Sequence, residues 1–110
     1  MSGNPAVVEE VEGFIVWDDE YYPKFFELLK KGYKELYFDA PYYWAVINLE
    51  TLTIYSLTEG DTKETRYATA EDLLKECDRQ IDWLKEHDHS PMMYGEYTHL
   101  RPVLEQLTKT

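Results

Sequence analysis

The sequence predicts an α+β domain in which an antiparallel meander of three to four strands, at about 33–69, packs with helices as a two-layer sandwich. Apolar residues recur at helical spacing in 18–31 and 70–87, whereas β-forming residues dominate between these segments. Short links between successive strands favour antiparallel neighbours. With 110 residues, 44% of them hydrophobic, the chain is large enough for one core. We therefore expect a single domain over 1–110, with residues 1–5 disordered.

The first helix is predicted at 18–31, in the segment DDEYYPKFFELLKK. Its leading acids suit the positive end of the helix dipole, and Pro23 fits the first turn, where its missing N–H is not needed. An apolar stripe follows, formed by Tyr21, Tyr22, Phe25, Leu28 and Leu29. Gly32 supplies a left-handed stop. Ahead of the helix, GFIVW indicates a short strand at 13–17, although the preceding valines also have helical spacing.

Four β-forming segments follow this helix. They are YKELYFD at 33–39, YYWAVINL at 42–49, LTIYSLT at 52–58 and KETRYAT at 63–69. The second and third flank the dipeptide ET and therefore indicate a hairpin, and EGD makes the next turn. The last segment is the most polar, which is typical of an edge strand.

The second long helix is predicted at 70–87. TAED at its start is a capping box, in which the Thr69 hydroxyl accepts from the amide of Asp72 and the Asp72 side chain reaches back. One face is apolar and carries Leu73, Leu74, Cys77, Ile81 and Leu84. Pro91 ends the helix. The segment THLRPVLEQL, at 98–107, predicts a short C-terminal helix.

Charge is the clearest global signal. The chain has 22 acids and 11 bases, a formal net charge of −11. This field would repel a phosphate backbone, so we expect no direct nucleic-acid binding, whereas a basic protein would be attracted. Apolar runs such as YYWAVI are too short to span a membrane, and MSGNPAVVEE lacks the features of a secretory signal. A single cysteine fits a reducing compartment, so we expect a cytoplasmic protein.

Five residues are the predicted partner-binding site. Asp78, Asp82 and Glu86 recur at four-residue steps on the second helix and place carboxylates roughly 6 Å apart, an imitation of a phosphate row. Tyr43 and Tyr55 are the expected aromatic anchors, because a two-layer sandwich leaves one sheet face open and tyrosine is enriched at interfaces. We therefore expect an inhibitor, immunity or accessory protein for a basic, nucleic-acid-handling partner. The alternatives are that the charge only maintains solubility, that the rings fill an aromatic core, and that the open face pairs with itself in a homodimer.

The segment EHDHSPMM raises the alternative of a metal site. His87 and His89, with His99, would suit copper, nickel or zinc. The spacing matches no established ligand motif, however, and histidines in the last turn of a helix are favoured by its dipole. We therefore expect no metal and no other cofactor.

No catalytic motif stands out in the sequence. It has no glycine-rich phosphate loop and no Gly-x-Ser-x-Gly segment. Cys77, on the apolar helix face, is more typical of a core residue than of a nucleophile. We expect no enzyme, and the alternative is a small-molecule-binding protein or enzyme that uses the His87–His89 turn or a tyrosine-lined pocket.

Overall fold

The computed structural model describes residues 6–39, 43–86, 102 and 105–106. Its elements are β1 (Val7–Phe14), α1 (Trp17–Lys30), β2 (Lys34–Asp39), β3 (Tyr43–Asn48), β4 (Thr53–Thr58), β5 (Asp61–Tyr67) and α2 (Ala70–Glu86). All strand pairs are antiparallel, in one sheet of order β1-β5-β4-β3-β2. The predicted α+β class and the meander are confirmed. Among the described residues, no helix has the length and apolar character needed to cross a membrane.

The strand β1 adds a fifth strand to the predicted three or four. The sequence predicted a strand at 13–17, but β1 spans Val7–Phe14 and pairs with β5. The polar strand β5 is therefore not at an edge, contrary to its prediction. Local pattern could not show this pairing, because it joins segments some fifty residues apart, such as Glu10 with Thr65. The predicted disordered segment 1–5 lies outside the described residues, and of the predicted helix at 98–107 only 102, 105 and 106 are described, all helical.

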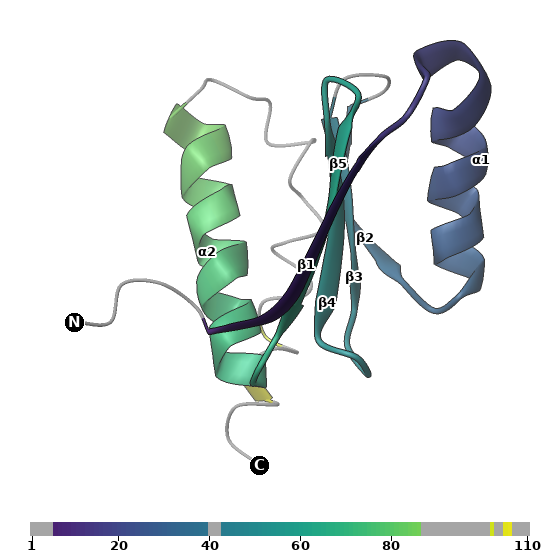
Figure 1. The fold of residues 1–110 in the computed structure, drawn as a ribbon. Coiled ribbons are helices and arrows are strands. Elements are labelled where there is room, and N and C mark those ends of the chain that lie inside the picture. The colour runs from purple at the N-terminus through teal and green to yellow at the C-terminus, as the bar shows by residue number, and fades with distance from the viewer. Residues whose placement is uncertain (1–5, 40–42, 87–101, 103–104, 107–110) are drawn as a thin grey trace.

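The sheet is packed on both faces, one layer more than the predicted sandwich. Figure 1 shows α1 and α2 on opposite sides of the strands. Alternation along β3 supplies both cores: Trp44 packs in the cluster toward α1, and Ala45 packs in the cluster toward α2. The α1-side core contains Ile15, Phe25, Leu28, Trp44, Val46, Tyr55 and Leu57. The α2-side core contains Leu36, Tyr37, Ala45, Ile47, Ile54, Tyr67, Leu73 and Cys77.

A β-bulge in β2 directs neighbouring side chains into the two different cores. The register shifts between Glu35, opposite Val46, and Tyr37, opposite Ala45. Leu36 is thus the extra residue, and it joins Tyr37 in the α2-side core while Phe38 packs against the α1-side core.

The helix signals in the sequence are confirmed. The amide of Asp72 donates to Thr69 Oγ1 at 3.1 Å, and the Thr69 hydroxyl donates to Asp72 Oδ2 at 2.8 Å, which lowers the pKa of Asp72. Gly32 has a φ of 99°, the left-handed conformation that its place after α1 predicted. Helix α2 is described as far as Glu86, and the predicted end at 87 lies outside the described residues.

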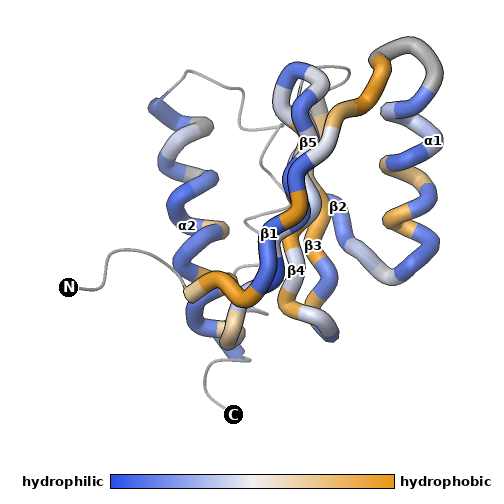
Figure 2. Tube along the Cα trace, viewed as in Figure 1, coloured by the Kyte–Doolittle hydropathy of each residue, from blue (hydrophilic) through white to orange (hydrophobic). Residues whose placement is uncertain are grey.

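Figure 2 shows how the apolar residues are distributed. Hydrophobic residues occur along β3 and β4 between the two helices, and the tube of β1 alternates between hydrophobic and hydrophilic residues. Four of the six residues of β3 are buried, and every residue of β1 is exposed. The centre of the sheet is therefore its stable part, and β1 is its exposed margin.

Two cores on opposite faces predict independent energetics. We expect Leu28→Ala and Leu73→Ala each to lower the free energy of unfolding by about 2–4 kcal/mol, since both side chains are buried. The double variant should lose the sum to within about 0.5 kcal/mol, because the sheet separates the two sites. Urea denaturation measures all three values. Val11→Ala, at an exposed position, is the control, and a coupling above about 1.5 kcal/mol would show that the two leucines share one cluster.

Candidate functional site

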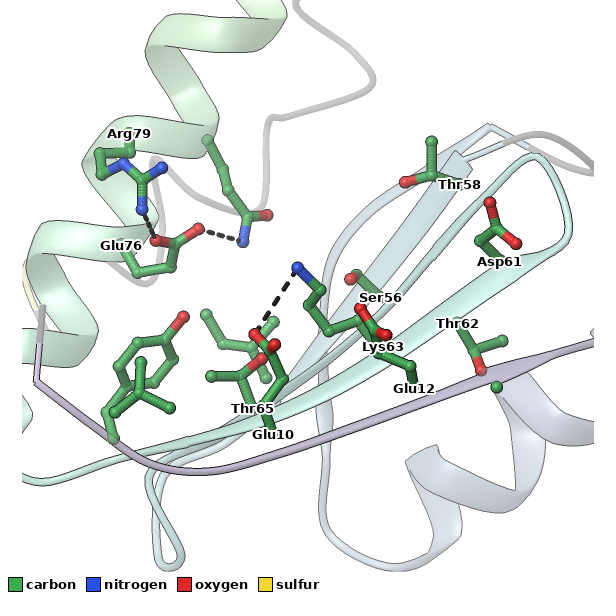
Figure 3. A pocket seen from close by; sticks show the side chains of 15 residues that line it. Glu10, Glu12, Ser56, Thr58, Asp61, Thr62, Lys63, Thr65, Glu76 and Arg79 are labelled. Carbon is green, nitrogen blue, oxygen red and sulfur yellow. Dashed lines mark hydrogen bonds and ion pairs between the residues drawn. The ribbon is translucent and has the colours of Figure 1, made fainter. Parts of the chain in front are cut away.

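A cleft of about 860 Å³ opens between α2 and the half of the sheet formed by β4, β5 and β1 (Figure 3). We call it the α2 cleft. Helix α2 packs on the sheet through Leu73 and Cys77, and the sheet extends past it toward β1. Strand alternation turns Glu10 and Glu12 of β1 toward the cleft, and α2 contributes Glu76. Polar and charged side chains therefore dominate its lining.

Two of these carboxylates are already engaged. Glu10 pairs with Lys63 of β5, with 3.6 Å between Oε2 and Nζ. Glu76 accepts a hydrogen bond from Arg79 on one oxygen and one from Gln80 Nε2, at 3.1 Å, on the other. The cleft therefore presents held ion pairs, and no three metal-ligating side chains come together among the described residues. This arrangement suits polar contacts with a partner better than acid–base chemistry.

A smaller aromatic hollow of about 300 Å³ adjoins the α2 cleft. Tyr37, Tyr43 and Trp83 line it, and it shares Ser56, Thr58 and Gln80 with the cleft. The ring centroids of Tyr43 and Trp83 are 6.3 Å apart. The hollow has the tyrosine lining that the small-molecule alternative requires.

The acidic row predicted on α2 lies on the outer side of the helix. Asp82 and Glu86 are exposed and Asp78 is half-buried, while Leu73 and Cys77 face the core. Three bases interrupt the row. Lys75 is held by Glu71 at 3.8 Å and Arg79 by Glu76, whereas Lys85 has no ion pair within the described residues. Asp82 and Glu86 have no ion pair within the described part of the chain.

The prediction that Tyr55 lies on an open sheet face is wrong. Its side chain is 8% exposed and stacks on Trp44 with ring centroids 5.5 Å apart, under Lys24 of α1. Because α1 and α2 cover both faces, Tyr37 and Tyr67 are buried as well. Tyr43 is half-buried, and its hydroxyl donates to Glu59 Oε1 at 3.2 Å. Tyr55 is therefore a core residue, and Tyr43 stays a candidate contact.

The sequence reasoning missed an exposed apolar row on β1. Its large hydrophobic residues are Val7 (50% exposed), Val8 (55%), Val11 (52%) and Phe14 (65%). In the described residues β1 pairs on one side only, with β5. We call this open side of residues 7–14 the β1 edge. The acids between the apolar residues of VVEEVEGF were the available signal, because a buried strand would not carry three glutamates.

Cys77 has the environment of a structural residue. Its side chain is 1% exposed, and burial raises the pKa of the thiol to about 12. Little thiolate is therefore present at neutral pH, which argues against a cysteine nucleophile. The histidines of the metal alternative, His87, His89 and His99, lie outside the described residues.

Comparisons with known proteins give no further guide to function. No family model matches the chain, and neither a curated protein nor a solved structure is significantly similar to it. The case for a function therefore depends on the chemistry of the surfaces described above.

The burial of Cys77 predicts slow thiol labelling. With its pKa near 12, the native thiol should react with Ellman's reagent at pH 8 at least a hundredfold more slowly than the thiol unfolded in guanidinium chloride. Absorbance at 412 nm follows the reaction. Rapid stoichiometric labelling of the native protein would show instead an accessible, activated thiol and reopen the question of catalysis.

Proposed function

We propose that the protein acts by binding another protein that carries an excess of positive charge. The observation that supports this most directly is the state of the acids on the outer side of α2. Asp82 and Glu86 are exposed. Of the three bases on α2, Lys75 and Arg79 are held by other glutamates, and Lys85 has no ion pair within the described residues. The chain as a whole carries a net charge of −11. Such a field accelerates the approach of a basic partner and repels an acidic one.

The partner class follows from the spacing of these acids. Carboxylates at Asp78, Asp82 and Glu86 repeat at roughly 6 Å, close to the spacing of phosphates along one nucleic-acid strand. A protein that handles nucleic acid has cations arranged for that repeat. We therefore propose an inhibitor, immunity or accessory role toward such a protein, with the acidic row as a nucleic-acid mimic.

Aromatic contacts would add affinity beside the acidic row. Trp83 is 43% exposed and lies one helical turn before Glu86. Tyr43 lies close to it across the aromatic hollow. Tryptophan and tyrosine are enriched among the residues that dominate binding energy, so Trp83 takes the role first given to Tyr55.

A cytoplasmic setting and the absence of catalysis belong to the same proposal. A single buried thiol suits a reducing compartment. Two of the carboxylates that line the α2 cleft, Glu10 and Glu76, are engaged in ion pairs, and this supports binding over turnover. No cofactor is needed for such a role.

The second candidate function is small-molecule binding. The aromatic hollow of about 300 Å³ is at the lower end of ligand-pocket volumes, which run from about 300 to 1,000 Å³. Its three rings and the adjoining polar cleft favour a small aromatic or cationic ligand. The metal alternative at His87, His89 and His99 would require stoichiometric uptake of copper, nickel or zinc that a His87→Ala/His89→Ala variant loses.

The capture of basic proteins tests the main proposal. Immobilised protein should retain proteins of high isoelectric point from a native lysate at about 50 mM salt, and fewer at about 200 mM, because salt screens the exposed charges. Asp82→Asn/Glu86→Gln should lower this yield severalfold. Mass spectrometry identifies and quantifies the retained proteins.

A control variant with the same net charge as Asp82→Asn/Glu86→Gln shows whether the position of the removed acids matters, or only their number. Glu20→Gln/Glu50→Gln also removes two exposed acids, and should leave the yield near that of the native protein. Recovery of no basic protein at either salt concentration would contradict the proposed function. Equal losses in the two variants would show that the α2 row is not the binding surface.

A further inference from the structure

We propose that the β1 edge binds an extended, positively charged segment of another protein by strand addition, so that the segment continues the sheet beyond β1. The sign of the partner's charge rests on the proposed function. The site, the backbone geometry and the extended conformation of the ligand go beyond it. In the described residues this side of β1 has no neighbouring strand, and all eight residues of β1 are exposed.

Backbone geometry shows which groups the β1 edge presents. The Ile15 amide donates to Gly60 O at 2.8 Å, which directs Ile15 inward, toward the β4–β5 turn. Inward and outward groups alternate along an antiparallel strand, so Gly13 and Val11 also direct their N–H and C=O toward β5. The backbone groups of Glu10, Glu12 and Phe14 then point to the open side. An extended peptide can pair with these groups, as peptides do at the sheet edges of other binding proteins.

On the side where β1 pairs with β5, glutamates of β1 already lie opposite basic residues. Glu9 lies opposite Arg66, and Glu12 lies opposite Lys63, in the register with β5. Lys63 Nζ also reaches Glu10 Oε2 at 3.6 Å. A strand on the outer side would meet the same three glutamates from the other direction, and opposite charges across strands are stabilising. Because Glu10 and Glu12 share one face of β1, the incoming segment should carry Lys or Arg at alternate positions, opposite these two glutamates.

The exposed apolar residues complete the recognition pattern. Val11, on the face opposite to Glu10 and Glu12, would lie opposite an apolar residue of the added strand, where cross-strand apolar contacts favour pairing. Acids alone could be explained as protection of an edge against aggregation. Protection against aggregation does not explain the four apolar side chains of β1 that are 50–65% exposed, because exposed apolar residues promote association at a sheet edge.

Charge disfavours a second copy of this chain as the occupant. Antiparallel self-pairing centred on Glu10 sets Glu10 against Glu10, and pairing centred on Val11 sets Glu10 against Glu12. Like charges directly opposite each other destabilise a strand pair, and each copy carries a net charge of −11. A basic strand from another protein meets neither penalty.

Peptide binding to β1 variants tests this inference. The probe is a fluorescein-labelled, end-capped octapeptide of alternating Lys and Val, and fluorescence anisotropy at about 50 mM salt reports its affinity. Glu12→Gln and Glu12→Pro remove the same carboxylate, but only proline also removes the outward N–H. We expect Glu12→Gln to weaken binding about threefold and Glu12→Pro about tenfold beyond that. The urea midpoints of both variants show whether each remains folded.

Two further peptides test the backbone contact without altering the protein. A Lys/Val peptide that is N-methylated at every residue keeps its charge but has no backbone N–H to donate from either edge, and should bind at least tenfold more weakly to the native protein. A Glu/Val peptide should not bind. Strand addition is overturned if N-methylation has no effect, if Glu12→Pro and Glu12→Gln bind equally, or if the Lys/Val peptide does not bind at all.

The α2 variant separates this inference from the proposed function. One outcome is that Asp82→Asn/Glu86→Gln abolishes peptide binding while the Glu12 variants leave it intact. That result would support the proposal of a basic partner and contradict strand addition at β1. If sedimentation shows a dimer that Glu12→Pro dissociates, the edge serves self-pairing and the inference is wrong. Failure of the capture of basic proteins, with peptide binding at β1 intact, would contradict the proposed function and leave strand addition at β1 supported.

Discussion

The alternating burial of β3 and β4 is the constraint on which the rest of the structure depends. Trp44 and Val46 face α1, while Ala45 and Ile47 face α2, so each of the two helices has its own apolar surface to cover. The indole Nε1 of Trp44 is buried without a hydrogen-bond partner among the described residues, which shows how completely the α1 side is enclosed. Burial on both faces removes the open aromatic face that a one-sided sandwich would have.

This packing determines which surfaces remain for recognition. Helix α2 packs Leu73 and Cys77 against the sheet, so its acids are left on the outer side, where Asp82 and Glu86 are exposed. The helices lie on opposite faces of the sheet, and β1, at one end of the strand order, has every residue exposed. The two candidate surfaces, the acidic row and the β1 edge, therefore follow from one packing arrangement. Both carry a surplus of carboxylates, and both are suited to a basic partner.

Local signals predicted the fold well, and non-local ones were out of reach. The described bounds of the two helices agree with the predicted ranges 18–31 and 70–87 to about one residue. The signals for them, the Thr69 cap, the Gly32 stop and helical periodicity, all lie in or next to each segment. The pairing of β1 with β5 depends on residues distant in sequence, and the ambiguous VVEEVE pattern could not reveal it. The error over Tyr55 followed from assuming one covered face. Asp82 and Glu86 were predicted from their spacing, whereas the exposure of Phe14 could be seen only once β1 had been placed at the edge.

Residue-resolved amide hydrogen exchange of the free protein tests this arrangement most directly. Two covered faces and one open edge predict that amides of β3 and β4 exchange only through global unfolding. Within β1, the amides of Val11 and Gly13 should be protected by β5, while those of Glu10, Glu12 and Phe14 should exchange at nearly the rate of an unstructured chain. Equal protection of the two sets would mean that the edge is covered, and fast exchange of both would mean that β1 is not part of the sheet.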